Sequence, residues 1–164
     1  MLRRSSIVLL AAAFAALAST GPVEGQLRAP RPVLTPSAEP ATVRAGRTAK
    51  LVLTVALPDA IHVQSNKPRD AAFFPTALVL TPPAGVTVTG TMYPKAVDFV
   101  QEGQPAPLAV FEKTFTVTAT VSVAGSVKPG PLVVPGRFDY QACDDKLCYR
   151  PVKTEVAWTL TVAP

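Results

Sequence analysis

Hydrophobic and polar residues alternate along most of this chain with a period of two, rather than the helical period of about 3.6. The alternation is clearest at residues 115–121, which read Phe-Thr-Val-Thr-Ala-Thr-Val. A strand with this pattern places one face against a core and the other toward solvent. Similar runs rich in valine, threonine and aromatic residues predict β-strands at Leu51–Leu57, Thr76–Thr81, Val86–Thr89, Phe111–Val123 and Val156–Val162.

Turn-forming residues separate these runs. Clusters containing proline or glycine occur at residues 57–59, 81–85, 103–107 and 128–131, and no convincing amphipathic helix follows the first residues of the chain. About seven or eight short strands at this spacing predict an all-β fold, an immunoglobulin-like β-sandwich. Trp158 lies in the last predicted strand and is expected in the core.

The N-terminal residues have the pattern of a secretory signal peptide. A basic pair at residues 3–4 precedes an apolar run at residues 7–18, which ends in an Ala-x-Ala cleavage pattern. We therefore assign residues 1–18 to a signal peptide, with cleavage after Gly25 as the alternative. The apolar run is too short to span a bilayer comfortably, so no stable membrane insertion is expected after cleavage. A membrane anchor is disfavoured because polar, proline-rich sequence begins at Ser19.

Export predicts a periplasmic or otherwise exported location, in an oxidising compartment. Residues 19–39 contain prolines among small and basic residues and predict an extended tether. Residues 40–164 are then one folded domain, for which we expect a monomer. The net charge of +5 is carried by scattered lysines and arginines. Nucleic-acid binding requires a concentrated basic face, so no nucleic-acid partner is predicted.

The two cysteines of the chain, Cys143 and Cys148, lie in the segment 140–151, which reads Tyr-Gln-Ala-Cys-Asp-Asp-Lys-Leu-Cys-Tyr-Arg-Pro. Residues five apart on one strand face opposite sides of a sheet, so these cysteines can pair only if the chain reverses between them. A hairpin loop at residues 144–147 would bring their Cα atoms to about 4.5 Å, a distance that a disulfide permits. We predict that the Cys pair lies on a hairpin.

Three roles are open to the pair: a redox centre, a structural staple or part of a metal site. A disulfide that closes a loop of about six residues contributes roughly 2 kcal/mol, so a bridge placed for stability would gain more between distant strands. Zinc requires four ligands, whereas the chain has two cysteines and one histidine. A copper(I) site from Cys143, Cys148, His62 and Met92 lacks supporting motif spacing. We therefore predict neither metal nor cofactor.

The segment around the cysteines resembles the active-site hairpin of the N-terminal periplasmic domain of the thiol:disulfide interchange protein DsbD. The resemblance extends over about residues 38–162. Its motifs are Tyr-Gln-Ala-Cys at 140–143, Cys-Tyr-Arg-Pro at 148–151, Ile-His-Val-Gln-Ser-Asn-Lys-Pro at 61–68, Phe-Pro-Thr at 74–76, Gly-Val at 85–86 leading to Tyr-Pro at 93–94, and Lys-Pro-Gly at 128–130.

The resemblance implies a thiol-disulfide oxidoreductase, similar to protein-disulfide reductases, in which Cys143 and Cys148 are the catalytic residues. Such a domain takes reducing equivalents from a membrane thiol reductase and passes them to periplasmic thioredoxin-fold proteins. A cap loop bearing an aromatic residue covers the pair in that family. Asp98 and Phe99 occupy the matching segment here, with Tyr140 as a second cover, although Phe99 could equally be an ordinary core residue.

Several positions depart from the family pattern. Better-known members fuse this domain to a membrane domain and a thioredoxin-like domain, and we expect both to be separate chains here. The loop between the cysteines is one residue shorter. His62 and Gln64 stand where the family often has aromatics, which predicts a more polar shielding wall. His62 could be catalytic or an exposed strand-edge residue. The alternative function is a non-catalytic binding module with a structural hairpin disulfide, with copper as a candidate ligand.

Overall fold

The computed structural model of the protein describes residues 28–164, and within that range every regular element is a β-strand. The predicted signal peptide lies outside the described residues. The first sheet is antiparallel and consists, in spatial order, of β1 (Val33–Glu39), β3 (Thr48–Ala56), β9 (Thr114–Val123) and β6 (Val86–Met92). The second sheet consists of β2 (Thr42–Arg44), β12 (Val152–Ala163), β10 (Gly130–Tyr140) and β5 (Ala77–Leu80).

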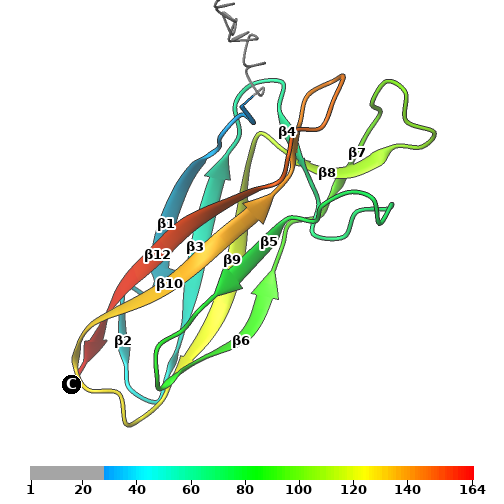
Figure 1. Ribbon diagram of the computed structural model, residues 1–164. Helices are drawn as coiled ribbons and strands as arrows, with labels where there is room; N and C mark the ends of the chain where they lie inside the picture. Colours follow the sequence, from blue (N-terminus) through cyan, green and yellow to red (C-terminus); the bar gives the residue numbers. More distant parts are fainter. Residues whose placement is uncertain (1–27) are drawn as a thin grey trace, which may run out of the picture.

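A third, smaller sheet consists of β11 (Ala142–Cys143), β4 (His62–Gln64), β8 (Leu108–Glu112) and β7 (Val97–Phe99). It lies at one end of the elongated molecule, and the C-terminus lies at the other (Figure 1). The two larger sheets form the sandwich, as the alternation predicts. The immunoglobulin-like β-sandwich is therefore confirmed.

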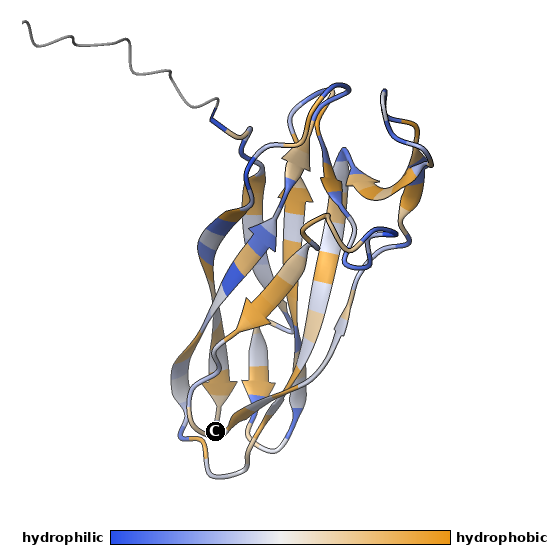
Figure 2. Ribbon diagram, turned by 45° about the vertical axis from the view of Figure 1, so that its right-hand side comes forward, coloured by the Kyte–Doolittle hydropathy of each residue, from blue (hydrophilic) through white to orange (hydrophobic). Residues whose placement is uncertain are grey.

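The core lies between the two larger sheets and extends to Val63, Phe111 and Ala142 of the third sheet. Inward residues of β9 alternate with solvent-facing threonines, and the hydrophobic residues form bands along the long strands (Figure 2). Trp158 is 1% exposed, and its indole N–H donates a hydrogen bond to the carbonyl of Val52 on β3, with a distance of 2.8 Å. Trp158 is thus the predicted core residue, with its one polar atom satisfied.

The expected tether is wrong for residues 33–39, because these residues form β1 and pair with β3. The proline-rich composition of this segment favours a tether over a strand, so the sequence does not reveal β1. Pro36 is tolerated because β1 is an edge strand with one neighbour, which leaves room for a residue without an N–H. Leu34 and Ala38 alternate along β1 and pack against the core. The folded domain therefore begins before residue 40.

Within residues 28–164 the number of strands is twelve, rather than seven or eight. The run predicted at 111–123 is divided by Lys113, whose φ of 57° breaks it into β8 and β9 of different sheets. Strands β2, β4, β7 and β11 have only two or three residues, too few for alternation to be visible. Among residues 28–164, no helix is long and apolar enough to cross a membrane.

Candidate functional site

The cysteines lie on a hairpin that follows β10 at the end of the sandwich occupied by the third sheet (Figure 1). Cys143 and Cys148 form an antiparallel bridge and are joined by a disulfide, with Cα atoms 4.0 Å apart. The amide of Tyr149 donates to the carbonyl of Ala142 at 2.8 Å, which closes the hairpin below the disulfide. The predicted chain reversal and hairpin are confirmed, and the Cα atoms are slightly closer than expected.

The loop between the cysteines is ordered by the carboxylate of Asp144. Its Oδ1 accepts hydrogen bonds from the amides of Lys146 and Leu147 at 2.9 and 2.8 Å, and its Oδ2 accepts one from the Tyr149 hydroxyl at 2.8 Å. These hydrogen bonds, led by that from Leu147, lower the pKa of Asp144 because they favour the carboxylate. An aspartate that binds the backbone two residues ahead is typical of a tight turn.

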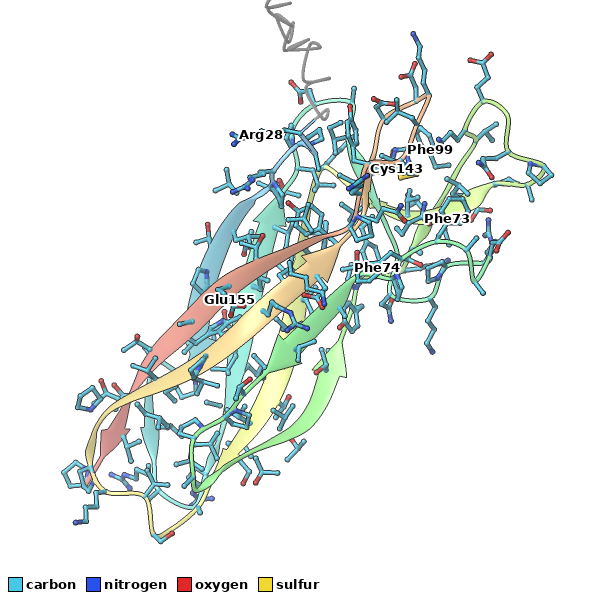
Figure 3. All side chains as sticks on the ribbon, viewed as in Figure 1. Arg28, Phe73, Phe74, Phe99, Cys143 and Glu155 are labelled. Carbon is cyan, nitrogen blue, oxygen red and sulfur yellow. A yellow bond between two sulfur atoms is a disulfide. The ribbon has the colours of Figure 1, made fainter. Side chains whose placement is uncertain are left out.

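Gln141 ties the hairpin to the loop that precedes β5. Its Oε1 accepts a hydrogen bond from the amide of Phe74 at 2.9 Å, and its Nε2 donates to the carbonyl of Tyr149 at 3.2 Å. Phe74 lies near the base of the hairpin (Figure 3). Both arms of the hairpin are therefore held against the body of the domain, while the tip at residues 145–147 is exposed.

The two cysteine residues differ in exposure. Cys143 is 0% exposed, because its strand β11 pairs with β4, where Cys143 lies opposite His62. Cys148 is only partly buried. A protein thiol approaching from solvent therefore meets Cys148 before Cys143.

A buried amide faces both sulfur atoms. The Nε2 of Gln64, on β4, lies 3.7 Å from Sγ of Cys143 and 4.0 Å from Sγ of Cys148. Gln64 is 0% exposed, and its Oε1 has no hydrogen-bond partner. The predicted polar wall beside the pair thus includes a group within hydrogen-bonding reach of sulfur.

His62 is 1% exposed, so the interpretation of this residue as an exposed strand-edge residue is wrong. Strand β4 is internal to its sheet, between β11 and β8, and therefore has no free edge. Burial lowers the pKa of His62, and this effect outweighs the opposing influences of Gln101, Glu112 and Asp144. The Nε2 of His62 is buried without a hydrogen-bond partner. The imidazole is therefore neutral near neutral pH.

Phe99 ends β7 and is half-buried. Its ring stacks on the ring of His62, with centroids 4.0 Å apart and planes inclined by 35°. Figure 3 shows Phe99 close to Cys143 at the end of the molecule. The structure thus brings two predicted shielding residues, His62 and Phe99, together beside the cysteine hairpin.

The other two predicted covers lie elsewhere. Asp98 is exposed and forms an ion pair with Arg69, whose Nη1 also donates to the carbonyl of Pro107 at 2.6 Å. Arg69 thereby joins both arms of the β7–β8 hairpin. Tyr140 is fully buried in the sandwich core, with its ring 5.5 Å from that of Phe138, and burial raises its pKa. Asp98 thus contributes an ion pair to the β7–β8 hairpin, and Tyr140 is a core residue of the sandwich.

A cavity of about 440 Å³ opens beside the His62–Phe99 pair. Its walls come from residues 57–62, from the β8–β9 junction at residues 112–114 and from Asp145 on the cysteine loop. The size falls within the range of small-ligand or side-chain pockets. A partner side chain that entered this cavity would lie against the predicted cap.

Within residues 28–164, no cluster of three or more histidine, cysteine, aspartate or glutamate side chains is arranged to hold a metal. Met92, the fourth residue of the candidate copper site, is 70% exposed at the end of β6 in the first sheet. Cys143 and Cys148 are joined to each other. The four residues are therefore not gathered as a ligand set in this state.

Sequence reasoning missed the roles of Gln64, Arg69 and Gln141. The family resemblance predicts Gln64 in the shielding wall, and its position two residues after His62 places both side chains on one strand face, but neither signal predicts a contact with sulfur. The partners of Arg69 are 29 and 38 residues distant. Contacts of that separation depend on the tertiary fold.

Together the fold and the site define an immunoglobulin-like β-sandwich that carries a disulfide on a hairpin at one end of the molecule. The family model described as "Thiol:disulfide interchange protein DsbD, N-terminal" matches residues 26–160. The chain therefore belongs to the family of DsbD N-terminal domains, which confirms the resemblance.

Two similar solved structures have low sequence identity. The reduced N-terminal domain of Neisseria meningitidis DsbD is 16% identical, with a TM-score of 0.46 over 82% of this chain and 91% of that one. The N-terminal periplasmic domain of Proteus mirabilis ScsB is 14% identical, with a TM-score of 0.48 over 80% of this chain and 47% of that one. The chain thus spans about half of that ScsB structure. Comparison with curated proteins gives no match.

Proposed function

We propose that this domain is a periplasmic thiol:disulfide exchange module that cycles Cys143 and Cys148 between disulfide and dithiol. In this role it relays reducing equivalents between a membrane thiol reductase and thioredoxin-fold partner proteins. Family membership supports the chemistry. The apolar N-terminal segment at residues 7–18 and the periplasmic origin of the ScsB domain support the compartment.

The observation that carries the proposal is the position of the disulfide. It closes a hairpin of sequence separation five and links no two sheets of the sandwich. A loop of this size gives only about 2 kcal/mol of chain-entropy stabilisation. The buried cluster around Trp158 contains neither cysteine, although Ala142 beside Cys143 belongs to it. Opening the disulfide is therefore compatible with an intact fold, as a redox cycle requires.

The geometry suggests an order for exchange. A partner thiolate attacks Sγ of Cys148, the more accessible sulfur, and forms a new disulfide while the Cys143–Cys148 bond breaks. The electron pair of the broken bond passes to Sγ of Cys143, which leaves as a thiolate. A second partner thiol, or Cys143 in the reverse direction, then resolves the mixed disulfide. Two electrons are transferred, and no metal or cofactor takes part.

The charged side chains near the cysteines do not strongly favour a thiolate, which suits a pair that reacts only when a partner protein is bound. Asp144 and Asp145 disfavour a thiolate by like charge, whereas Lys146 favours it. No helix lies among residues 28–164 to supply a positive N-terminal dipole. Phe99, stacked on His62, restricts access until a docking protein displaces it.

The test is reduction of the native protein. Glutathione or a thioredoxin-like protein should reduce the disulfide completely while near-ultraviolet circular dichroism of Trp158 is unchanged, with thiols counted by titration. A bridge that opens only in denaturant, with a potential below about −300 mV, would identify a structural staple and overturn the proposal.

A further inference from the structure

Gln64 occupies a position that stability alone explains poorly. Its side chain is 0% exposed, and its Oε1 has no hydrogen-bond partner among the described residues. An unsatisfied buried polar atom costs about 1–3 kcal/mol. An apolar side chain of similar length would avoid this cost at the same place. The contacts of the Gln64 side-chain amide must therefore explain why a polar residue is buried here.

The backbone of Gln64 is held on both sides. Its amide donates to the carbonyl of Gln141 at 3.2 Å, and its carbonyl accepts from the hydroxyl of Thr76 at 2.5 Å. Strand β4 is also paired with β11 and β8. The side-chain Nε2, at 3.7 Å from Sγ of Cys143 and 4.0 Å from Sγ of Cys148, is thus placed by a rigid part of the fold.

The strength of the hydrogen bond from Gln64 to sulfur depends on the redox state of the cysteine pair. Sulfur in a disulfide is a weak hydrogen-bond acceptor. A thiolate carries a full charge, and hydrogen bonds to charged groups are roughly twice as strong as neutral ones. A donor aimed at the sulfur atoms therefore gains strength only after the disulfide opens.

We propose that Gln64 is a positioning residue for exchange, whose amide N–H donates to the thiolate that forms on Cys143 when the disulfide opens. The inference rests on the proposed function. As the partner's sulfur bonds to Cys148, the electron pair of the breaking bond moves to Cys143, and the Gln64 amide is already in place beside that sulfur. Because a leaving thiolate of lower pKa departs faster, Gln64 accelerates opening and favours the reduced pair.

The neighbouring charged and titratable groups act alongside this donor. The cysteine loop contributes Asp144, Asp145 and Lys146, β8 contributes Glu112, and β4 contributes the buried His62. Within the described residues, Gln64 is the side chain whose hydrogen bonds reach both sulfur atoms. Its removal should therefore change the ionisation of the thiols while the charged groups stay constant.

The experiment replaces Gln64 in the otherwise intact protein. Gln64→Met keeps length without an N–H donor, and Gln64→Glu keeps shape while replacing the donor with an acceptor. The thiol ionisation is followed by thiolate absorbance, and the redox equilibrium with glutathione is measured at about pH 9, where an ordinary thiol is ionised. Val63→Ala, which removes a buried core side chain from the same strand, is the control for destabilisation.

We expect the acid dissociation constant of the thiol to fall about tenfold in Gln64→Met, which leaves about one-fifth of the wild-type thiolate at the wild-type midpoint. The equilibrium constant for reduction should fall several-fold at about pH 9, toward the tenfold limit of about 30 mV that holds where the thiols are fully ionised. Gln64→Glu should shift both quantities at least as far, and Val63→Ala should shift neither. In the reduced wild-type protein, the side-chain amide resonance of Gln64 should titrate with the thiol, a measurement that requires no variant.

The outcomes separate the two proposals. If the wild-type disulfide resists native reduction, the exchange function itself fails. If the wild-type protein exchanges normally but the Gln64 amide resonance does not follow thiol ionisation, the positioning role is wrong. The positioning role would also be overturned if the Gln64 variants fold and their thiol midpoint and redox equilibrium are unchanged.

Discussion

The ring of Phe99 stacks on the ring of His62 with centroids 4.0 Å apart, while His62 lies directly opposite Cys143 in the pairing of β4 with β11. The aromatic residue that ends β7 is thus connected to the buried cysteine through one intervening side chain. This arrangement is the basis for the proposal that Phe99 controls access to the pair.

Phe99→Ala should increase the rate at which a small alkylating reagent modifies the reduced pair several-fold. The loss of stability should be about 1–2 kcal/mol, below the range for a fully buried phenylalanine, because Phe99 is half-buried. Val100→Ala, at an adjacent position that is 81% exposed, should leave both quantities unchanged. A large fall in melting temperature with an unaltered alkylation rate would place Phe99 in the core and refute the cap role.

Arg69→Ala should loosen the β7–β8 hairpin, because Arg69 contacts both Asp98 on β7 and the carbonyl of Pro107. The ion pair is exposed, so the change in unfolding free energy should stay below about 1 kcal/mol. Amide hydrogen exchange at residues 97–108 should become faster, and alkylation of the reduced pair should increase. The comparison is Lys67→Ala, which removes an exposed cation from the same loop. If both substitutions changed hydrogen exchange and alkylation equally, the loss of a positive charge would explain the effect, and the contacts of Arg69 with Asp98 and Pro107 would not.

The difference in exposure between the two cysteine residues predicts an asymmetry in trapping. Cys143→Ala leaves the partly exposed Cys148, and Cys148→Ala leaves the fully buried Cys143. The first variant should yield several-fold more mixed disulfide with a thioredoxin-fold protein that lacks its resolving cysteine, measured by non-reducing electrophoresis. Equal yields would remove the proposed division of labour between the two cysteines.

The β-sandwich and the hairpin could be predicted because both depend on local signals. Alternation over many residues shows the long strands, and the spacing of Cys143 and Cys148 permits only a chain reversal if they pair. The short strands of the third sheet could not be predicted this way. His62–Gln64 has three residues, and its burial comes from neighbours on both sides that are distant in sequence.

The edge strand β1 was obscured for a different reason. Prolines are depleted from strands in general, but an edge strand with one partner tolerates them, so composition alone favours a tether where the fold has a strand. The contacts of Gln64 and Arg69 follow from how separate elements meet. Polar side chains acquire such contacts only in three dimensions, and neither the residue types nor the family position of Gln64 predicts them.

The buried His62 predicts a specific dependence of stability on pH. Its pKa is lowered in the folded state from the ordinary value of 6.5, chiefly by burial, so the unfolded state binds the proton more tightly. Stability from this residue is full above pH 6.5 and declines as the pH falls below it, with a slope of at most about 1.4 kcal/mol per pH unit. His62→Phe keeps a ring against Phe99 and should abolish this component. Urea unfolding of both proteins between about pH 5 and 8 measures the difference, in which the contributions of the carboxylates cancel. Parallel stability curves for wild type and variant would show that His62 is solvated and protonates freely in the folded domain.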